Sequence, residues 1–328
     1  MIKIIKYSNE NGLKEISLDD ITKWDYECTE NIWVDICNAT ESESQNILEN
    51  IFQFHPLAIE DALKYIKDHS VHLPKLEDFG EYLFIVFNGI KQETKTFRYG
   101  MFSLSCFLGH NFLVTIHNEP GENTFLKSLK NVLNERTFRK GPDYILNLIL
   151  DEIVDRYYPL IDTFEEESDK IEEDLFNGIP DNSTLKRILN LKRELLKLRR
   201  ISTYQKEILF KLIRGDSELI SLEESVYYRN VYDHLVRVSD TAESYRDYTA
   251  GMLDSYLSIV NNKMNEVMKF LTIIATIVLP LTLITGVFGM NFDFIPLLHD
   301  TLGFVFSMGL MSVVAIGMLL WFRHKKWI

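Results

Sequence analysis

Cysteine is scarce in this chain of 328 residues, which has only Cys28, Cys37 and Cys106. Their spacing matches no zinc-binding motif, and an odd number excludes a fully paired disulfide framework. We therefore expect three reduced thiols, as in a domain that faces the cytosol.

The signatures of energy-coupled and catalytic sites are missing as well. The chain contains no G-x-x-x-x-G-K-[ST] phosphate-binding loop. It also shows no nucleophile–base pair and no catalytic metal motif, so we predict that the protein is not an enzyme. Its first residues, MIKIIKYSNENGLKEIS, have no apolar run of signal-peptide length, and no cleaved export signal is expected.

Charge is absent from two long stretches near the C-terminus, Phe270–Phe292 and Thr301–Phe322. Each exceeds the roughly 20 residues that a helix needs to cross a bilayer core of about 30 Å. We therefore predict transmembrane helices over 270–290 and 301–322, joined by an extracytoplasmic loop over 291–300.

Lysine and arginine are missing from that loop, whereas Lys263 and Lys269 precede the first span and RHKKW follows the second. Cytoplasmic flanks of membrane helices are enriched in Lys and Arg. We therefore expect a multi-pass protein of the cell (inner) membrane with both termini cytoplasmic, residues 323–328 forming a basic tail.

The excess of acidic residues lies outside the predicted spans. The chain carries a net charge of −13, and residues 1–269 hold 46 acidic and 32 basic residues, a net of −14. An acidic surface attracts cations and repels phosphate backbones. We therefore expect divalent cations, and no nucleic acid, as partners.

Proline is rare after residue 142, since only Pro159 and Pro180 occur between Pro142 and Pro280. Residues 1–141 combine strand-like and helical segments and predict a cytoplasmic α/β domain. The sequence that follows is rich in charge and has apolar residues at helical spacing. It predicts a helical hairpin over 142–216 and a stalk over 217–269. We expect one helix from about 218 to 288, which continues through the membrane as the first span.

Polar and small residues recur every three or four positions along this helix and share one face. They are Asn265, Met268, Thr272, Ala275, Leu279, Thr282 and Gly286. Such a stripe either packs against another helix or lines a pore, and the residues alone leave both readings open. Two spans cannot enclose an aqueous path, so a pore requires several subunits around an axis.

An uncharged triplet, Gly289, Met290 and Asn291, stands where the first span ends. Irregular backbone at membrane depth is tolerated only where protein buries it or where it lines water. Mg²⁺ dehydrates reluctantly, and a ring of neutral carbonyl and amide oxygens suits an ion that keeps its water shell. Conduction also requires that each site along the pore binds the ion weakly enough to release it.

The order of these features resembles the CorA family of magnesium channels. The resemblance is carried by NKMNEVMKFLTIIATIVLPLTLITGVFGMNFDFIP (262–296), HPLAIEDAL (55–63) and YYRNVYDHLVRVSD (227–240). It covers essentially the whole chain. It implies a funnel-shaped homopentamer in which the triplet is the outer selectivity filter. It also implies pore-lining rings at Asn265, Met268, Leu271, Leu279 and Thr282.

The resemblance further implies a cytosolic Mg²⁺ sensor in which carboxylates from neighbouring subunits hold the channel closed. The first of them matches Asp61, and the second aligns with Asn230, an amide, so that Asp233 one turn further is an alternative ligand. Phe288 stands where many members have Tyr. Asp293 is expected at the outer mouth.

We therefore predict a Mg²⁺ channel for uptake, with passage of Co²⁺ and Ni²⁺ compatible, gated by intracellular Mg²⁺. Mg²⁺ is then both the transported and the regulatory ion, and the partners are membrane lipids and other copies of the chain. The alternatives are a Zn²⁺ transporter of the same superfamily and a non-conducting membrane scaffold. Against zinc, the Met of the triplet is intact as Met290.

Overall fold

The computed structural model describes residues 2–21, 28–68, 72–91, 97–118, 129, 132–177, 181–290 and 301–327. Contacts divide the chain into two units, Met1–Leu253 and Asp254–Ile328. Helix α9, Ser225–Phe288, contributes residues to both units.

The first unit contains a seven-stranded sheet with the order β2-β1-β3-β7-β6-β5-β4. Only the β3–β7 pair is parallel among the described strands, and the other neighbours run antiparallel. The strands are β1 Ile2–Ser8, β2 Gly12–Glu15, β3 Asn31–Cys37, β4 Lys75–Asp78, β5 Tyr82–Ile90, β6 Met101–Gly109 and β7 Phe112–His117. Strands β6 and β7 pair as an antiparallel hairpin that turns at residues 109–111.

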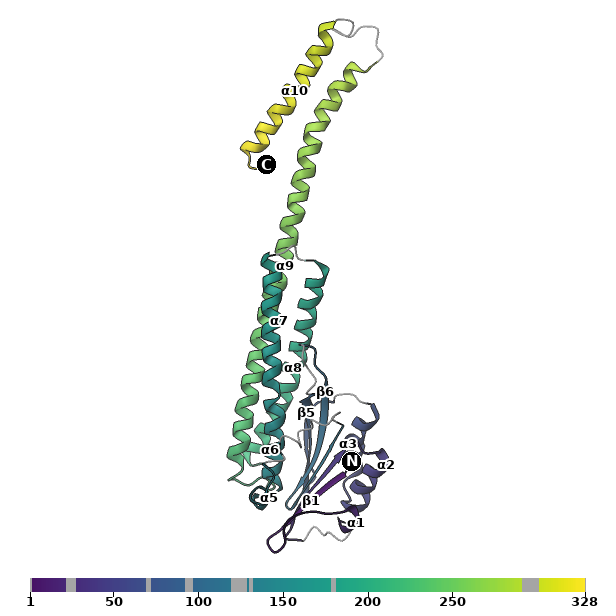
Figure 1. The fold of residues 1–328 in the computed structure, drawn as a ribbon, viewed down its shortest axis with the longest axis vertical. Coiled ribbons are helices and arrows are strands. Elements are labelled where there is room, and N and C mark those ends of the chain that lie inside the picture. The colour runs from purple at the N-terminus through teal and green to yellow at the C-terminus, as the bar shows by residue number, and fades with distance from the viewer. Residues whose placement is uncertain are drawn as a thin grey trace. The chain divides into compact units, whose positions relative to one another are not determined.

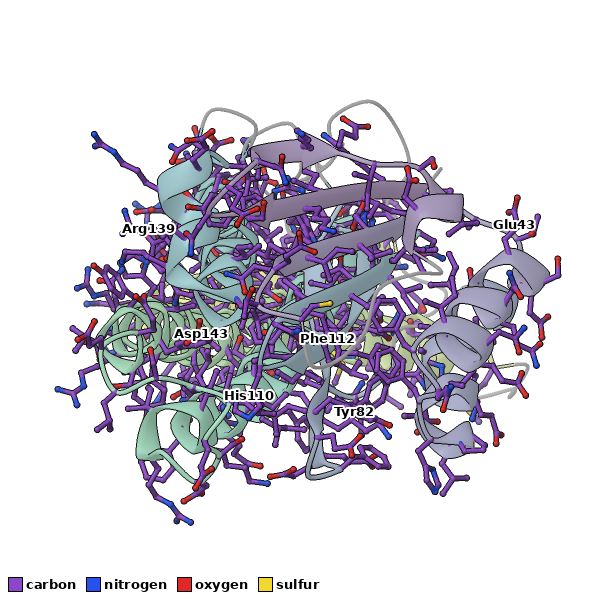
Figure 2. All side chains as sticks on the ribbon, turned by 90° about the horizontal axis from the view of Figure 1, so that it is seen from below. Glu43, Tyr82, His110, Phe112, Arg139 and Asp143 are labelled. Atoms are coloured by element: carbon purple, nitrogen blue, oxygen red, sulfur yellow. The ribbon has the colours of Figure 1, made fainter. Side chains whose placement is uncertain are left out.

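Every residue of β5, β6 and β7 is buried, because helices cover both faces of the sheet. On one face lie α2 (Glu41–Gln45), the π-helical turn Asn46–Ile51 and α3 (Pro56–Asp68) (Figure 1). The Phe54 ring stacks on the Phe107 ring with a distance of 4.2 Å between ring centroids, and its centroid lies 4.7 Å from that of the Tyr82 ring. Figure 2 shows Tyr82 and Phe112 on the side of the sheet that faces these helices.

The other face is covered by α6, Pro142–Asp155, which contacts strands β3, β5, β6 and β7. Pro142 occupies its first turn, where a missing N–H does no harm. Of the shorter elements, α1 is Leu18–Ile21 and α5 is Glu135–Lys140. The predicted α/β character of the N-terminal region is thus confirmed.

The hairpin predicted over 142–216 consists of α7, Tyr157–Asn177, and α8, Asn182–Arg214, while α6, the first helix of that range, covers the sheet instead. Asp181 caps α8 by accepting from the backbone N–H of Ser183 and Thr184 at 2.9 and 3.0 Å. At the other end Gly215 adopts a left-handed φ of 76°, a conformation that glycine tolerates at a helix terminus. Local capping therefore sets both ends of α8.

The long helix begins at Ser225, not near residue 218 as the apolar pattern predicts. The preceding residues form turns that are held from a distance. The Ser221 N–H donates to Asp143 at 3.1 Å, and Lys140 Nζ lies 3.3 Å from a Glu224 carboxylate oxygen. These contacts tie the turns before α9 to α5 and α6.

In the second unit, α10 (Thr301–His324) runs back along the C-terminal part of α9 (Figure 1). Both helices are long and apolar enough to cross a membrane. Large apolar side chains remain exposed on each of them, for example Leu283 at 69% and Phe304 at 73%. Exposed apolar surface of this kind is typical of helices that face lipid or other membrane helices.

A buried polar network joins strands β3 and β7. The His117 Nε2 atom lies 3.3 Å from Asp35 Oδ1, which also accepts from the Thr115 hydroxyl at 2.6 Å. Trp33 Nε1 donates to the same hydroxyl oxygen at 3.0 Å. Burial lowers the pKa of His117, but the Asp35 charge and hydrogen bonds to Asp35 and Cys37 outweigh it and raise the pKa to about 10.

From the raised pKa of His117 we predict that the folded chain loses stability as the pH becomes alkaline. Its pKa is raised in the folded chain above the ordinary value of 6.5, so the folded state holds the proton more tightly than the unfolded state. The stabilisation is complete below about pH 6.5 and is lost as the pH rises through about 10. Melting temperatures of the full chain in detergent should fall across this range. The variant His117→Asn should lack this part of the fall, and an unchanged slope would contradict the assignment.

Candidate functional site

The helix that carries the predicted filter ends in a tight turn. The Gly289 N–H donates to Thr285 O at 2.9 Å and to Gly286 O at 3.2 Å, and the Met290 N–H donates to Val287 O at 3.4 Å. A Cβ added to Gly289 would lie 3.0 Å from Thr285 O, closer than about nine in ten real Cβ contacts. Glycine is therefore favoured here by close backbone approach.

Met290 is the last described residue before the gap, and its side chain is 45% exposed. Asn291, the third member of the triplet, and Asp293, expected at the outer mouth, lie outside the described residues. The loop predicted over 291–300 lies outside them entirely.

The predicted pore-lining residues are exposed along α9. Leu271 is 60% exposed, Met268 57% and Leu279 68%, and Asn265 and Thr282 are also exposed. The face turned away from solvent is a different one, formed by residues that are buried or half-buried at helical spacing. These are Ile273, Ile277, Pro280 and Ile284.

The two faces lie on opposite sides of the helix, because successive residues turn by about 100° at 3.6 residues per turn. Only 6% of the apolar window of α9 is buried among the described residues, and the polar stripe lies within this uncovered surface. This placement is what a pore-lining or subunit-packing surface requires.

Hydroxyl groups on the stripe already use their protons within the helix. Thr272 donates to Met268 O at 2.7 Å and Thr282 donates to Val278 O at 2.9 Å. Their oxygen lone pairs remain available as acceptors. Water bound to a cation is a hydrogen-bond donor, so these hydroxyls suit a hydrated cation.

At the other end of the stripe, a groove of about 510 Å³ is lined by residues of the second unit. It brings together three stripe residues, Asn265, Met268 and Thr272, with Trp327 of the C-terminal tail. Trp327 itself stacks on Phe322 at 5.6 Å.

Asp61, the first predicted sensor ligand, is ion-paired within its own chain. Its carboxylate contacts Lys75 Nζ, which also lies 2.9 Å from Glu77 Oε1. Burial lowers the pKa of Lys75, but the two carboxylates outweigh it and raise the pKa. A cation that binds Asp61 therefore competes with a charged amine.

Asn230 and Asp233, the other predicted sensor residues, are both exposed on α9. Neither they nor Asp61 belong to the group of described His, Cys, Asp and Glu side chains that lie close enough to share a metal ion. A single chain thus leaves these two residues free to meet groups from elsewhere.

The group that the structure does bring together is Asp151, Asp155 and His234, a cluster not predicted from the sequence. One ligand atom from each lies within 4.8 Å of the others. His234 Nδ1 is 3.2 Å from Asp155 Oδ1 and 3.9 Å from Asp151 Oδ1. The available sequence signal was the DEIVD spacing of α6, which places both carboxylates on one helical face.

Electrostatics in this cluster favour an added positive charge. Burial raises the pKa of Asp151, the Asp155 charge raises it further, and His234 lowers it. The Asp151 Oδ1 atom is itself buried and has no hydrogen-bond partner among the described residues. Carboxylate oxygens are preferred ligands of Mg²⁺, and imidazole suits Zn²⁺, Cu²⁺ and Ni²⁺. The cluster therefore suits a divalent cation.

Comparison with known proteins agrees with this architecture. The family model described as CorA-like Mg2+ transporter protein matches residues 29–325. The cobalt/magnesium transport protein CorA of Thermotoga maritima is 36% identical over 299 residues, covering 90% of this chain and 83% of that protein. The zinc transport protein ZntB of Yersinia enterocolitica is 23% identical over 323 residues, covering 97% and 93%.

Among solved structures, the CorA magnesium transporter from Methanocaldococcus jannaschii is similar with a TM-score of 0.82 at 24% identity. The match covers 100% of this chain and 99% of that one. At this identity the structural match shows the fold, while the family model and the first relative carry the assignment. An α/β domain, long helices and two apolar C-terminal helices, matched along nearly the whole sequence, place this chain in the CorA-like family of Mg²⁺ transporters.

Proposed function

We propose that the chain is one subunit of a channel that admits Mg²⁺ into the cell. The observation that carries this proposal is the exposed polar stripe of α9, which ends at the tight turn of Gly289 and Met290. A stripe on one face of a single helix becomes a continuous lining only when several copies surround an axis. Five copies, by resemblance to the CorA channels, complete the pore.

In this proposal the triplet Gly289, Met290 and Asn291 is the selectivity filter. Gly289 permits the chain to turn sharply at the helix end, which exposes neighbouring carbonyl groups. Neutral oxygens can accept hydrogen bonds from the water shell of Mg²⁺ without removing it. Asp293 then attracts cations to the outer mouth, and the rings along α9 conduct them inward.

Uptake needs no nucleotide hydrolysis in this arrangement. A divalent ion that enters a cell with a negative interior gains about 4.6 kcal/mol per 100 mV of membrane potential. We place both termini in the cytoplasm, because the Lys and Arg residues flank the spans on that side. A permanent inward gradient makes a gate necessary.

We propose that Mg²⁺ bound to the first unit closes this gate. The candidate ligands are Asp61 of one subunit and Asn230 or Asp233 of a neighbour, with Asp151, Asp155 and His234, the residue that follows Asp233, as a second cation site. Binding to the closed state alone shifts the population towards it. The amide of Asn230 removes one charge per interface, so the Asp cluster carries more of the regulation here.

The experiment that tests the proposal is ion flux into liposomes containing the purified full-length protein. We expect Mg²⁺ influx, with Co²⁺ and Ni²⁺ passing and Zn²⁺ passing more slowly. Internal Mg²⁺ should reduce the flux.

Three outcomes would contradict parts of this proposal. Faster flux of Zn²⁺ than of Mg²⁺ would favour the zinc-transporting alternative. The reason to consider this alternative is the 23% identity to ZntB. No flux of any divalent ion, with the protein correctly inserted, would favour a scaffold. Flux that does not respond to internal Mg²⁺ would contradict the proposed Mg²⁺ gate but would still support the proposed channel.

A further inference from the structure

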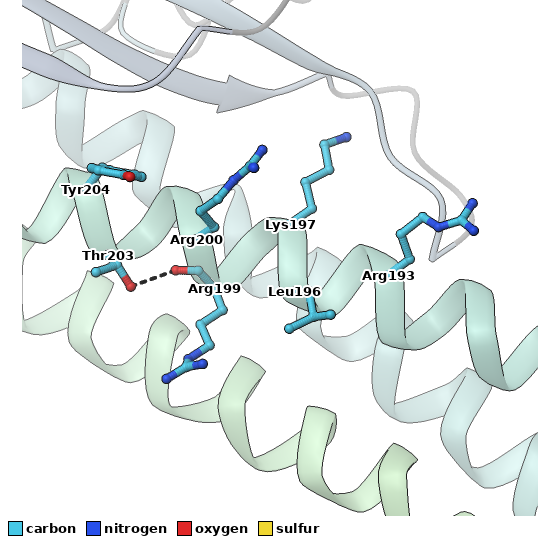
Figure 3. A pocket seen from close by; sticks show the side chains of 7 residues that line it. All are labelled: Arg193, Leu196, Lys197, Arg199, Arg200, Thr203 and Tyr204. Atoms are coloured by element: carbon cyan, nitrogen blue, oxygen red, sulfur yellow. Dashed lines mark hydrogen bonds between the residues drawn. The ribbon is translucent and has the colours of Figure 1, made fainter. Parts of the chain in front are cut away.

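One groove of about 720 Å³ in the first unit is cationic, although the chain as a whole carries a net charge of −13. It runs along α8 and is lined by Arg193, Leu196, Lys197, Arg199, Arg200, Thr203 and Tyr204 (Figure 3). Four of these seven side chains are positively charged. None of them has a role in the proposed transport.

The side chains that matter lie on one ridge of the helix. Arg193, Lys197, Arg200 and Tyr204 are spaced by four, three and four residues, and Figure 3 shows them extending from the same side of α8. The ridge spans roughly 16 Å at about 1.5 Å per residue. A linear array of charges of this length matches an elongated anion better than a single small one.

Two of the cations lack a charged partner among the described residues. Arg199 is paired with Glu243 of α9 at 2.9 Å, and Lys197 Nζ lies 3.9 Å from a Glu194 carboxylate oxygen and 4.5 Å from the centre of the Tyr99 ring. In contrast, Arg193 and Arg200 make no ion pair or side-chain hydrogen bond within the described part of the chain, and both are exposed. Arginine forks pair bidentately with phosphate oxygens.

The groove also offers contacts for an aromatic ring. Tyr204 is 36% exposed and Leu196 44% exposed beside the charged ridge. Exposed rings of this kind stack on planar ligand groups. The groove volume of about 720 Å³ lies within the usual range of about 300–1,000 Å³ for small-molecule sites.

We propose that this groove binds a nucleoside triphosphate, with the phosphates on Arg193, Lys197 and Arg200 and the base against Tyr204. The phosphates neutralise two guanidinium groups that the protein leaves unpaired. The binding requires no divalent ion at the groove itself. It is therefore independent of the proposed transport, and either proposal can fail alone.

The test is calorimetric titration of the full-length protein in detergent with ATP, tripolyphosphate and inorganic phosphate. EDTA is present, so that chelation of Mg²⁺ by the nucleotide does not contribute heat. We expect ATP to bind with a Kd below about 1 mM, one molecule per subunit, and more weakly as salt is raised. Inorganic phosphate should bind at least about tenfold more weakly.

Two variants separate the charged ridge from the ring. Arg193→Ala with Arg200→Ala should weaken ATP and tripolyphosphate alike by at least about tenfold. Tyr204→Ala should weaken ATP and leave tripolyphosphate unchanged. The matched control is Lys186→Ala with Lys211→Ala, which removes two exposed cations from the same helix outside the groove and should leave both affinities within about twofold.

Several results would overturn the proposal. They are an absence of ATP binding to the wild type, equal loss in the control and the arginine variants, and a change of oligomeric state in the arginine variant with ATP affinity unchanged. The last result would make the groove an interface between copies. Glycerol 3-phosphate represents an anionic lipid headgroup, and tighter binding of it than of ATP would favour a lipid.

Discussion

Asn291→Ala is expected to lower the initial rate of Mg²⁺ flux into liposomes by at least about tenfold. The substitution removes an amide oxygen and two N–H donors from every subunit at the proposed filter. A loss of about 1.4 kcal/mol of interaction with the hydrated ion at the rate-limiting site already corresponds to a factor of ten. Because the residue recurs around the axis, the effect multiplies with the number of subunits.

The matched control is Ser312→Ala, which removes a polar group from α10. Its hydroxyl donates to Met308 O at 2.9 Å within the helix, and no pore role is proposed for it. Flux through this variant should stay within about twofold of the wild type. If Asn291→Ala conducts Mg²⁺ as fast as the wild type, the triplet is not the filter.

Replacing Asp151 and Asp155 together by Asn should weaken inhibition by internal Mg²⁺ by at least about tenfold. The two carboxylates lie with His234 in a cluster where an Asp151 oxygen has no hydrogen-bond partner within the described part of the chain. Asparagine keeps the shape of each side chain but removes two negative charges per subunit. Mg²⁺ binds chiefly through carboxylates and retained waters, so the closed state loses affinity and the channel stays open at higher Mg²⁺.

This result is distinguishable from a general change in surface charge. The control Asp240→Asn with Asp254→Asn removes two exposed carboxylates from α9 outside the cluster and should leave the inhibition midpoint unchanged. The opposite change, Asn230→Asp, adds a carboxylate and should tighten inhibition. An unchanged midpoint in the Asp151 and Asp155 variant would show that the cluster has no part in gating.

Helix and strand identities were predictable here because they depend on neighbouring residues. The uncharged runs ending at Phe292 and Phe322 indicate membrane helices by length and composition alone, and the structure has apolar helices there. Asp181 and Gly215, which bound α8, act through hydrogen bonds and φ angles within a few residues.

Features that depend on contacts with residues far away in the chain were not predictable from local patterns. The start of α9 moves to Ser225 because Asp143 and Lys140, some 80 residues earlier, hold the intervening turns. Asp61 could be named as a ligand from the family resemblance, but its pairing with Lys75 comes from strand β4 beside α3. No pattern of neighbouring residues predicts such a contact.

By itself the sequence determined the classes of element, the two apolar C-terminal helices and the polar stripe that leads to Gly289, since each follows from spacing along one segment. The tertiary structure alone decided which charges meet. It placed β3 parallel to β7 and brought His234 to Asp151 and Asp155 across about 80 residues. It also left Arg193 and Arg200 without charged partners among the described residues. Ion pairs depend on distances of a few ångströms between groups remote in the chain, and only the packed fold sets those distances.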